Sequence, residues 1–267
     1  MKKHLKRRSI VLAFTSLLFL TTQAKATVVQ IQTVLGNIDI NLFDQTTPET
    51  VRNFLSYVNS GAYMNNVMHR SEPGFVVQAG GFRFDDTFPP VAIPTDPPVI
   101  NEPVLSNLRG TIAMAKAAGN PNSATSQWFI SLADNSANLD VQNGGFTVFG
   151  QVLGDGMEVV DAIAALERFN AGGAFNTLPV RDFTQADVDA GRDPEADNLV
   201  IITDVIVIDS AVVTNPDIVP VPNTLLNAGG GDNPPNQDSG SGGGTLNLLS
   251  FALLGLVLVF RGTFKRT

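Results

Sequence analysis

Residues 68–82 read MHRSEPGFVVQAGGF, and this stretch carries the strongest indication of how the chain folds. It places a cation, Arg70, shortly before an apolar run, Phe75–Val77, that is typical of a buried strand. A charged side chain beside such a strand must be ion-paired, must extend its charged end to water, or must serve chemistry. The remainder of the sequence decides among these three possibilities.

The first 26 residues are predicted to be a secretory signal peptide. An apolar run over residues 10–20 follows a basic start made of Lys2, Lys3, Lys6, Arg7 and Arg8. Ala24-Lys25-Ala26 then provides a small-x-small cleavage site, and the apolar run is too short for a stable membrane span. We therefore expect an exported protein. The sequence contains no cysteine, which excludes a disulfide framework and a thiolate site.

Once residues 1–26 are removed, His69 is the only histidine of the chain. A zinc site built from His and Cys is therefore excluded, and a Ser-His-Asp triad would have to use His69. No G-x-S-x-G motif accompanies it. We expect His69 to be a partly buried strand residue with a satisfied hydrogen bond.

Charge is distributed unevenly along the chain. Six of the 17 Lys and Arg residues lie before Thr27 and three lie after Phe260, whereas all 25 Asp and Glu residues lie between, which leaves this middle segment with a net charge of −17. A protein body this acidic should repel nucleic acid and anionic lipid, so we expect neither as a partner.

Short segments of alternating polarity predict a mainly β protein. The predicted strands are a hairpin over residues 27–42 and single strands over residues 75–78, 110–115, 128–132, 146–152 and 199–208. Two amphipathic helices are predicted over residues 47–61, with Thr47 as N-cap, and 156–166. Many short strands with only two helices favour an antiparallel barrel or sandwich. Two long segments, 85–103 and 170–198, are predicted to be loops.

Composition divides the mature chain into a globular domain over residues 27–212, a Pro/Gly/Asn-rich linker over 213–245 and a tail over 246–267. The apolar run 246–260 is slightly short for a membrane span and is followed by Arg261, Lys265 and Arg266. One interpretation is a simple membrane anchor. Residues 239–267 also resemble the GlyGly-CTERM sorting tail, which implies removal by a rhomboid-type protease and display at, or release from, the cell surface.

Four motifs in the globular part occur in the order found in the cyclophilin-type peptidyl-prolyl isomerases, and together the chain resembles the bacterial branch of that family over about residues 28–208. They are MHRSEPGFVVQAGGF (Met68–Phe82), NEPVLSNLRGTIAMAK (Asn101–Lys116), NSATSQWFI (Asn122–Ile130) and FTVFGQVLGDGMEVVDAI (Phe146–Ile163). The resemblance implies a closed antiparallel β-barrel of about eight strands capped by two α-helices. It also implies rotation about X-Pro bonds in unfolded or extended polypeptides by a monomer, without cofactor or metal.

Carried over residue by residue, the resemblance makes Arg70 the catalytic residue. The substrate-binding residues that it implies are Phe75, Val76, Gln78, Gln127, Phe129, Leu139 and Phe146. Ala117 or Ala118 should lie beside the substrate backbone. The chain departs from the family pattern at Ser71-Glu72, where an apolar pair is usual, at Trp128, which replaces Phe, and at Asn138, which replaces an aromatic residue of the outer pocket and weakens the expected sensitivity to cyclosporin.

Two functions are consistent with these residues. The first is an exported isomerase that accelerates the folding of envelope or secreted proteins in the periplasm, where the C-terminal tail makes the only membrane contact. The second is a proline-peptide-binding module or holdase chaperone whose isomerase activity is weak or incidental, with Ser71-Glu72 and Asn138 marking an altered surface. A third possibility, a mere carrier for the tail, is disfavoured because the pocket residues are present.

Overall fold

The computed structural model describes residues 27–210, 215 and 217–226. The predicted signal peptide, the tail and most of the linker lie outside these residues. Within them no helix combines the length and the apolar character that crossing a membrane requires.

Thirteen strands and four α-helices make up the described part of the chain. The strands are β1 (Val28–Thr33), β2 (Gly36–Leu42), β3 (Asn66–Val67), β4 (Arg70–Glu72), β5 (Val76–Ala79), β6 (Phe82–Arg83), β7 (Val91–Ala92), β8 (Thr111–Met114), β9 (Trp128–Ser131), β10 (Val148–Val152), β11 (Glu167–Phe169), β12 (Leu178–Val180) and β13 (Ile201–Asp209). The helices are α1 (Pro48–Asn59), α2 (Ser136–Leu139), α3 (Gly156–Ala164) and α4 (Gln185–Asp189). The protein is therefore mainly β, as the sequence predicts.

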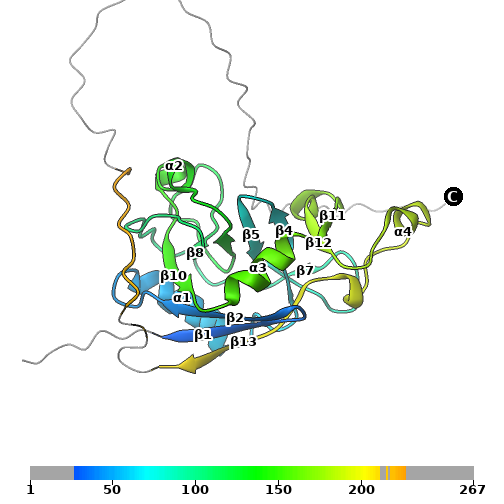
Figure 1. Cartoon of the computed structure of the whole chain (residues 1–267), viewed down its shortest axis with the longest axis horizontal. Helices are drawn as coiled ribbons and strands as arrows, with labels where there is room; N and C mark the ends of the chain where they lie inside the picture. Colours follow the sequence, from blue (N-terminus) through cyan, green and yellow to red (C-terminus); the bar gives the residue numbers. More distant parts are fainter. Residues whose placement is uncertain (1–26, 211–214, 216, 227–267) are drawn as a thin grey trace, which may run out of the picture.

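Eleven of these strands form one curled sheet in the order β4-β5-β9-β8-β10-β2-β1-β13-β3-β6-β7, in which the pairs are antiparallel (Figure 1). Strands β3 and β4 lie far apart in this order, yet only Met68 and His69 separate them along the chain. The Met68 amide donates to the carbonyl of Val200 (3.0 Å) and the His69 amide donates to that of Gln78 (3.1 Å). The short segment from β3 to β4 is therefore hydrogen-bonded to the residue before β13 on one side and to β5 on the other, although β13 and β5 lie far apart in the strand order.

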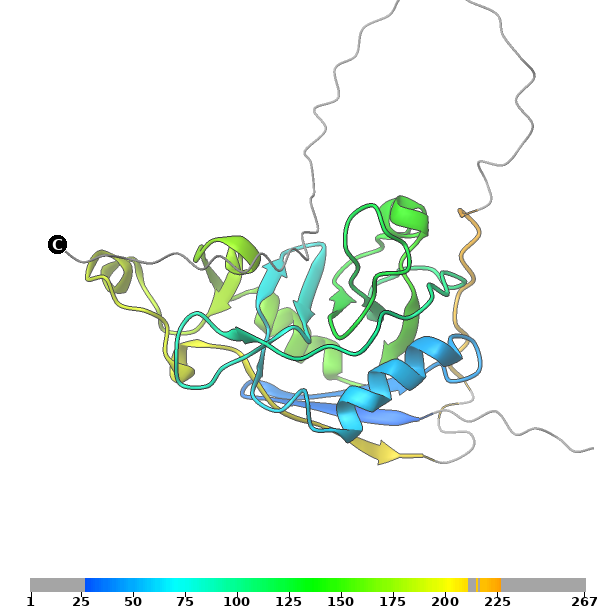
Figure 2. The ribbon, with the colours of Figure 1, turned by 180° about the vertical axis from the view of Figure 1, so that it is seen from behind.

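The main hydrophobic core lies between the strands of this sheet and the helices α1 and α3. Alternation along β2 buries Ile38 and Ile40 completely, and the same core contains residues of α1 and α3. Helix α3 lies toward the viewer in Figure 1 and α1 lies toward the viewer in Figure 2, so the two helices lie on opposite sides of the molecule. Both predicted helices are thus confirmed, and α2 and α4 are short additions.

The N-terminus of α1 is capped differently from the prediction. Thr47 does occupy the N-cap position, but its side chain makes no capping hydrogen bond. Instead Glu102, far along the chain, accepts hydrogen bonds from the amides of Glu49 (3.3 Å) and Thr50 (2.8 Å). A carboxylate offsets the partial positive charge of a helix N-terminus and satisfies its free amides, which a threonine hydroxyl does less strongly.

Residues 170–198, predicted to be a loop, contain ordered structure. Strand β12 and helix α4 lie within this segment, and β12 pairs with β11, which directly precedes the segment, as a separate two-stranded sheet. We call residues 167–199 the extension; Figures 1 and 2 show it projecting from the end of the molecule near β4 and β5. It packs on the sheet through a cluster that includes Phe84, Phe175, Leu178, Val180 and Phe183. The prediction failed because aromatic residues spaced irregularly along the chain leave no periodic pattern.

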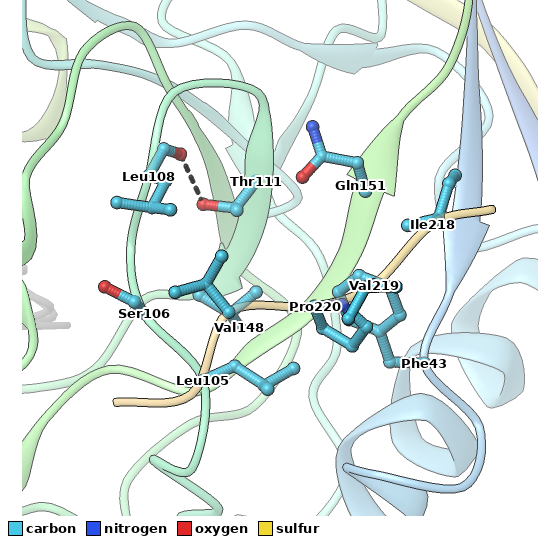
Figure 3. A pocket seen from close by; sticks show the side chains of 11 residues that line it. Phe43, Leu105, Ser106, Leu108, Thr111, Val148, Gln151, Ile218, Val219 and Pro220 are labelled. Atoms are coloured by element: carbon cyan, nitrogen blue, oxygen red, sulfur yellow. Dashed lines mark hydrogen bonds between the residues drawn. The ribbon is translucent and has the colours of Figure 1, made fainter. Parts of the chain in front are cut away.

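Residues 217–226, inside the predicted linker, run along the domain at the end opposite the extension, and we call them the strap (Figures 1 and 2). The Ser106 amide donates to the carbonyl of Val221 (2.8 Å), and the Asn223 amide donates to that of Val104 (2.9 Å). The Asn223 side chain also donates to the carbonyl of Asp140 (2.9 Å), which directly follows α2 and its last residue Leu139. Beneath the strap a cavity of about 240 Å³ is walled mainly by apolar side chains such as Phe43 and those of the strap itself (Figure 3).

Candidate active site

Strands β4, β5 and β9 place the predicted site residues on one face of the sheet. Arg70 lies opposite Gln78 in the β4–β5 pair, and Gln78 lies opposite Phe129 in the β5–β9 pair. Residues directly opposite one another in an antiparallel pair share a face, so these three side chains stand in a row. Their neighbours Val77 and Ile130 point to the other face and belong to the main core. The alternation of the strands therefore separates the site from the core.

A chain of polar contacts runs along this row. Arg70 Nη1 donates to Gln78 Oε1 (3.2 Å), and Gln78 Nε2 donates to Gln127 Oε1 (2.9 Å). On its other side Arg70 Nε lies 3.5 Å from Glu72 Oε1, an ion pair in which the two side chains are 15% and 28% exposed. Burial lowers the pKa of Arg70 from its ordinary value, and the Glu72 carboxylate opposes that shift. An arginine keeps its positive charge in proteins, so the row carries one fixed cation with a set direction.

The predicted hydrophobic residues gather beside this row. Val76, Phe129, Leu139 and Phe146 belong to one buried cluster, and Phe75 packs against it while remaining partly exposed. The rings of Phe129 and Phe146 meet edge to face with centroids 5.8 Å apart. Each of the four buried side chains is at most 2% exposed, so they pack on one another. The structure thus brings together all eight residues that the sequence singled out.

Lys116 also lies in this region, although it was not among the predicted site residues. Its side chain is buried, and its Nζ lies 4.6 Å from the centroid of the Phe146 ring, in cation–π contact. The same Nζ donates to the carbonyls of Asn143 (2.9 Å) and Gly145. Burial lowers the pKa of Lys116 to about 8. The sequence does carry an indication of this role: Lys116 directly follows the buried residues Ala113–Ala115, and a cation next to a buried segment needs polar or aromatic partners.

The adjoining loop contacts one of the two alanines that the sequence analysis considered. The Asn143 side chain donates to the carbonyl of Ala117 (3.0 Å), whereas Ala118 is exposed. Of the two alternatives that the sequence left open, Ala117 is therefore the one tied to the loop that carries Phe146.

His69 is more deeply buried than predicted. It lies between β3 and β4, is only 2% exposed, and its Nδ1 has no hydrogen-bond partner among the described residues. Its ring meets the edge of Phe82 at 4.8 Å and that of Phe175 at 6.4 Å. The aromatic cluster of the extension therefore surrounds the imidazole more completely than the sequence predicts.

This burial makes the stability of the protein dependent on pH. Burial lowers the pKa of His69 to about 3, so between that value and about pH 6.5 the unfolded chain binds a proton that the folded chain does not. The contribution to stability is complete above about pH 6.5 and is lost progressively as the pH falls toward 3. Between pH 7 and 4.5 we expect a loss of about 2.5 kcal/mol in the free energy of unfolding from this group.

Urea unfolding of the wild type and of His69→Phe at the two pH values isolates this contribution from that of the carboxylates. The variant should lose less stability than the wild type by about that amount. Equal losses in the two proteins would show that His69 does not titrate as its burial requires.

The chain is similar in sequence to several known proteins. Residues 28–184 match the family model described as cyclophilin type peptidyl-prolyl cis-trans isomerase/CLD. The chain is 47% identical over 151 residues to peptidyl-prolyl cis-trans isomerase A of Dickeya dadantii, which covers 55% of this chain and 76% of that protein. It is 42% identical over 161 residues to a peptidyl-prolyl cis-trans isomerase of Acinetobacter baylyi, with 60% and 82% covered. A solved cyclophilin-type isomerase of Cryptosporidium parvum aligns with a TM-score of 0.49 at 22% identity, over 70% of this chain and 99% of that one.

Proposed function

Because this chain belongs to the cyclophilin-type peptidyl-prolyl cis-trans isomerase family and is an isomerase of that kind, we propose that it accelerates X-Pro isomerisation in envelope or secreted proteins while they fold. The observation that carries the proposal is the row Arg70–Gln78–Gln127 beside the cluster of Phe129 and Phe146. It places one oriented cation next to an apolar cluster at whose edge Phe75 is partly exposed, and an X-Pro isomerase needs a directed donor and apolar contact with the proline ring.

The chemistry requires no bond to break. Rotation about a peptide bond faces a barrier of roughly 18–20 kcal/mol because amide resonance is lost. As the X-Pro amide twists, its nitrogen regains a lone pair and becomes a better hydrogen-bond acceptor. A donor aimed at that nitrogen therefore stabilises the transition state more than either planar isomer. A ~10⁵-fold acceleration corresponds to lowering the barrier by about 7 kcal/mol.

Arg70 is the donor in this proposal. Gln78 holds Nη1 and Glu72 lies beside Nε, whereas Nη2 makes no hydrogen bond to any described residue. Nη2 is therefore available to donate to a prolyl nitrogen. Phe75, Val76, Phe129, Leu139 and Phe146 would contact the proline ring, and the glutamines would orient the arginine and bind the peptide backbone.

A protease-coupled cis/trans assay on the purified chain, with an Ala-Pro peptide as substrate, tests the proposal. We expect catalysed exchange that saturates with peptide concentration. Saturable binding of the peptide, measured by calorimetry, without any acceleration would instead support the proline-peptide-binding module or holdase.

We also propose that the protein is exported and that its tail is processed after export. Support comes from the sequence alone: the basic and apolar segment over residues 1–26, and the short apolar run 246–260 preceded by Gly242–Gly244. A short span preceded by glycines unwinds easily at the membrane surface, which exposes its backbone to an intramembrane protease. The Pro/Gly/Asn-rich residues before it would hold the domain away from the membrane.

Intact-mass analysis of protein from the native cell tests this part separately. A chain that begins near Thr27 and ends between about residues 242 and 249, found at the cell surface, in the outer membrane or in the medium, is the expected result. A chain that ends at Thr267 and stays in the inner membrane would leave only the simple anchor.

The proposal includes a closed barrel of about eight strands and a monomeric protein. The continuity of β3 and β4 supports closure, because a single chain segment bonds to β13 on one side and to β5 on the other. Sedimentation at several protein concentrations would test the monomer, since self-association would raise the apparent mass with concentration.

A further inference from the structure

A carboxylate, Glu72, stands beside the proposed catalytic arginine. We propose that Glu72 is a positioning residue for Arg70, and that Thr177 of the extension holds Glu72 in place. The inference rests on the isomerase function proposed for Arg70. It assigns the extension a role at the site: to restrict the directions in which the guanidinium can point.

Strand geometry brings the two charged side chains together. Arg70 and Glu72 are two residues apart in β4, so their side chains project from the same face of the sheet. The intervening Ser71 is fully buried on the opposite face. Arg70 Nε lies 3.5 Å from Glu72 Oε1, and both side chains are mostly shielded from water, at 15% and 28% exposed. Reduced contact with water strengthens such a pair relative to one on an open surface.

Thr177 holds Glu72 from the far side. Thr177 Oγ1 donates to Glu72 Oε1 (3.1 Å), the same oxygen that faces Arg70, although the two residues are 105 positions apart in the chain. The carbonyl of Thr177 also accepts from the amide of Ser71 (2.9 Å), so backbone and side chain of Thr177 both attach to β4. Without these contacts the glutamate side chain, which rotates about each of its carbon–carbon bonds, would sample several rotamers.

The extension is itself anchored firmly enough to transmit this constraint. Thr177 immediately precedes β12, and Leu178 of that strand is fully buried in the cluster beneath the extension. Phe175, two residues before Thr177, packs against Phe82 with ring centroids 4.8 Å apart. Buried residues on both sides of Thr177 therefore leave its hydroxyl little freedom to move.

The guanidinium is consequently held at two of its three nitrogens. Gln78 accepts from Nη1, Glu72 faces Nε, and Nη2 remains for the substrate. Because the group is planar and rigid, contacts at two nitrogens fix the direction of the third. A donor that is already aimed costs no reorganisation when the amide twists, so the expected benefit appears in kcat more than in KM.

Three variants of the full mature chain test the role of Glu72. Glu72→Gln keeps the shape but removes the charge, Thr177→Val removes the hydroxyl donor, and Thr177→Ser restores it. We expect kcat to fall about fivefold in Glu72→Gln and about twofold to threefold in Thr177→Val, with KM within about twofold of wild type. Thr177→Ser should recover most of the lost kcat.

Asp161→Asn provides the matched control, because it removes another carboxylate–arginine pair, Asp161–Arg109 at 2.6 Å, that lies on α3 and outside the site. Its kcat should equal that of the wild type. The second readout is the Nε–Hε resonance of Arg70 in nitrogen-15 NMR. In the wild type it should be sharp and slow to exchange with water, and it should broaden in Glu72→Gln and in Thr177→Val but not in Asp161→Asn.

Unchanged kcat together with an unchanged Arg70 resonance in Glu72→Gln would overturn the inference. A fall in kcat of the same size in Asp161→Asn would also overturn it, since the effect would then be one of general stability. If the wild type itself shows no isomerase activity, the proposed function fails. The Arg70 resonance still decides whether Glu72 and Thr177 position the guanidinium, so the two failures can be told apart.

Discussion

Replacing Arg70 with lysine lowers kcat/KM by at least about a hundredfold while the protein keeps its fold; this is the largest effect on activity that we expect. Loss of a single preorganised donor to a transition state typically costs about 10²–10³-fold in rate. Lysine keeps the charge, but its ammonium is a point charge that cannot bond to Gln78 and direct a second, fixed N–H at the substrate. Arg70 is mostly buried, yet its partners are polar, so a lysine can still be accommodated.

The measurement is the cis/trans assay, with circular dichroism and urea unfolding as checks that the variant is folded. Arg52→Lys is the control: Arg52 also pairs with a glutamate, but its side chain is 69% exposed on α1 and lies outside the site. It should retain full activity. Turnover close to that of the wild type in a folded Arg70→Lys protein would remove Arg70 from the catalytic role.

The largest expected effect on stability comes from Phe129→Ala, which should also weaken peptide binding. Phe129 is 2% exposed and packs edge to face against Phe146. Truncating a buried phenylalanine leaves a cavity and typically costs about 3–5 kcal/mol in the free energy of unfolding. In the proposed site Phe129 also contacts the proline ring, so KM should rise together with the loss of stability.

Phe149→Ala separates these two effects. Phe149 is fully buried against Phe54, with ring centroids 5.1 Å apart, and belongs to the main core. It should lose a similar amount of stability while KM stays near that of the wild type. If either alanine variant does not fold, Phe129→Leu and Phe149→Leu provide the same comparison at lower cost. An unchanged KM in a folded Phe129 variant would make Phe129 a core residue and not a wall of the site.

The site residues could be named because they lie in the motifs that carry the family resemblance. In the structure, Arg70, Gln78 and Phe129 lie opposite one another on the neighbouring strands β4, β5 and β9 and share one face. The helices α1 and α3 could be predicted because apolar residues recur along one helical face.

The predictions that the structure corrects concern segments whose apolar residues follow neither the helix nor the strand periodicity. The extension was predicted to be a loop because its aromatic residues follow neither a strand nor a helix pattern, although they pack into one cluster. The strap was assigned to a linker by its composition, yet proline and asparagine do not prevent an extended segment from pairing with Val104 and Ser106. Capping of α1 by Glu102 was missed because the two lie more than fifty residues apart.

The sequence by itself determined the family, the alternation of the strands, and the identity of the residues that meet at the site. The alternation follows from local periodicity, whereas the family and the site residues follow from motifs that resemble those of a known family. Only the tertiary structure decided that Lys116 lies over Phe146, that His69 packs against Phe82 of β6 and Phe175 of the extension, and that Thr177 reaches Glu72 beside Arg70. The reason is physical. Each of these contacts depends on how irregular segments distant in sequence pack around the sheet. The free energy that selects such packing is the sum of many small contributions from buried atoms, so no single stretch of residues predicts it.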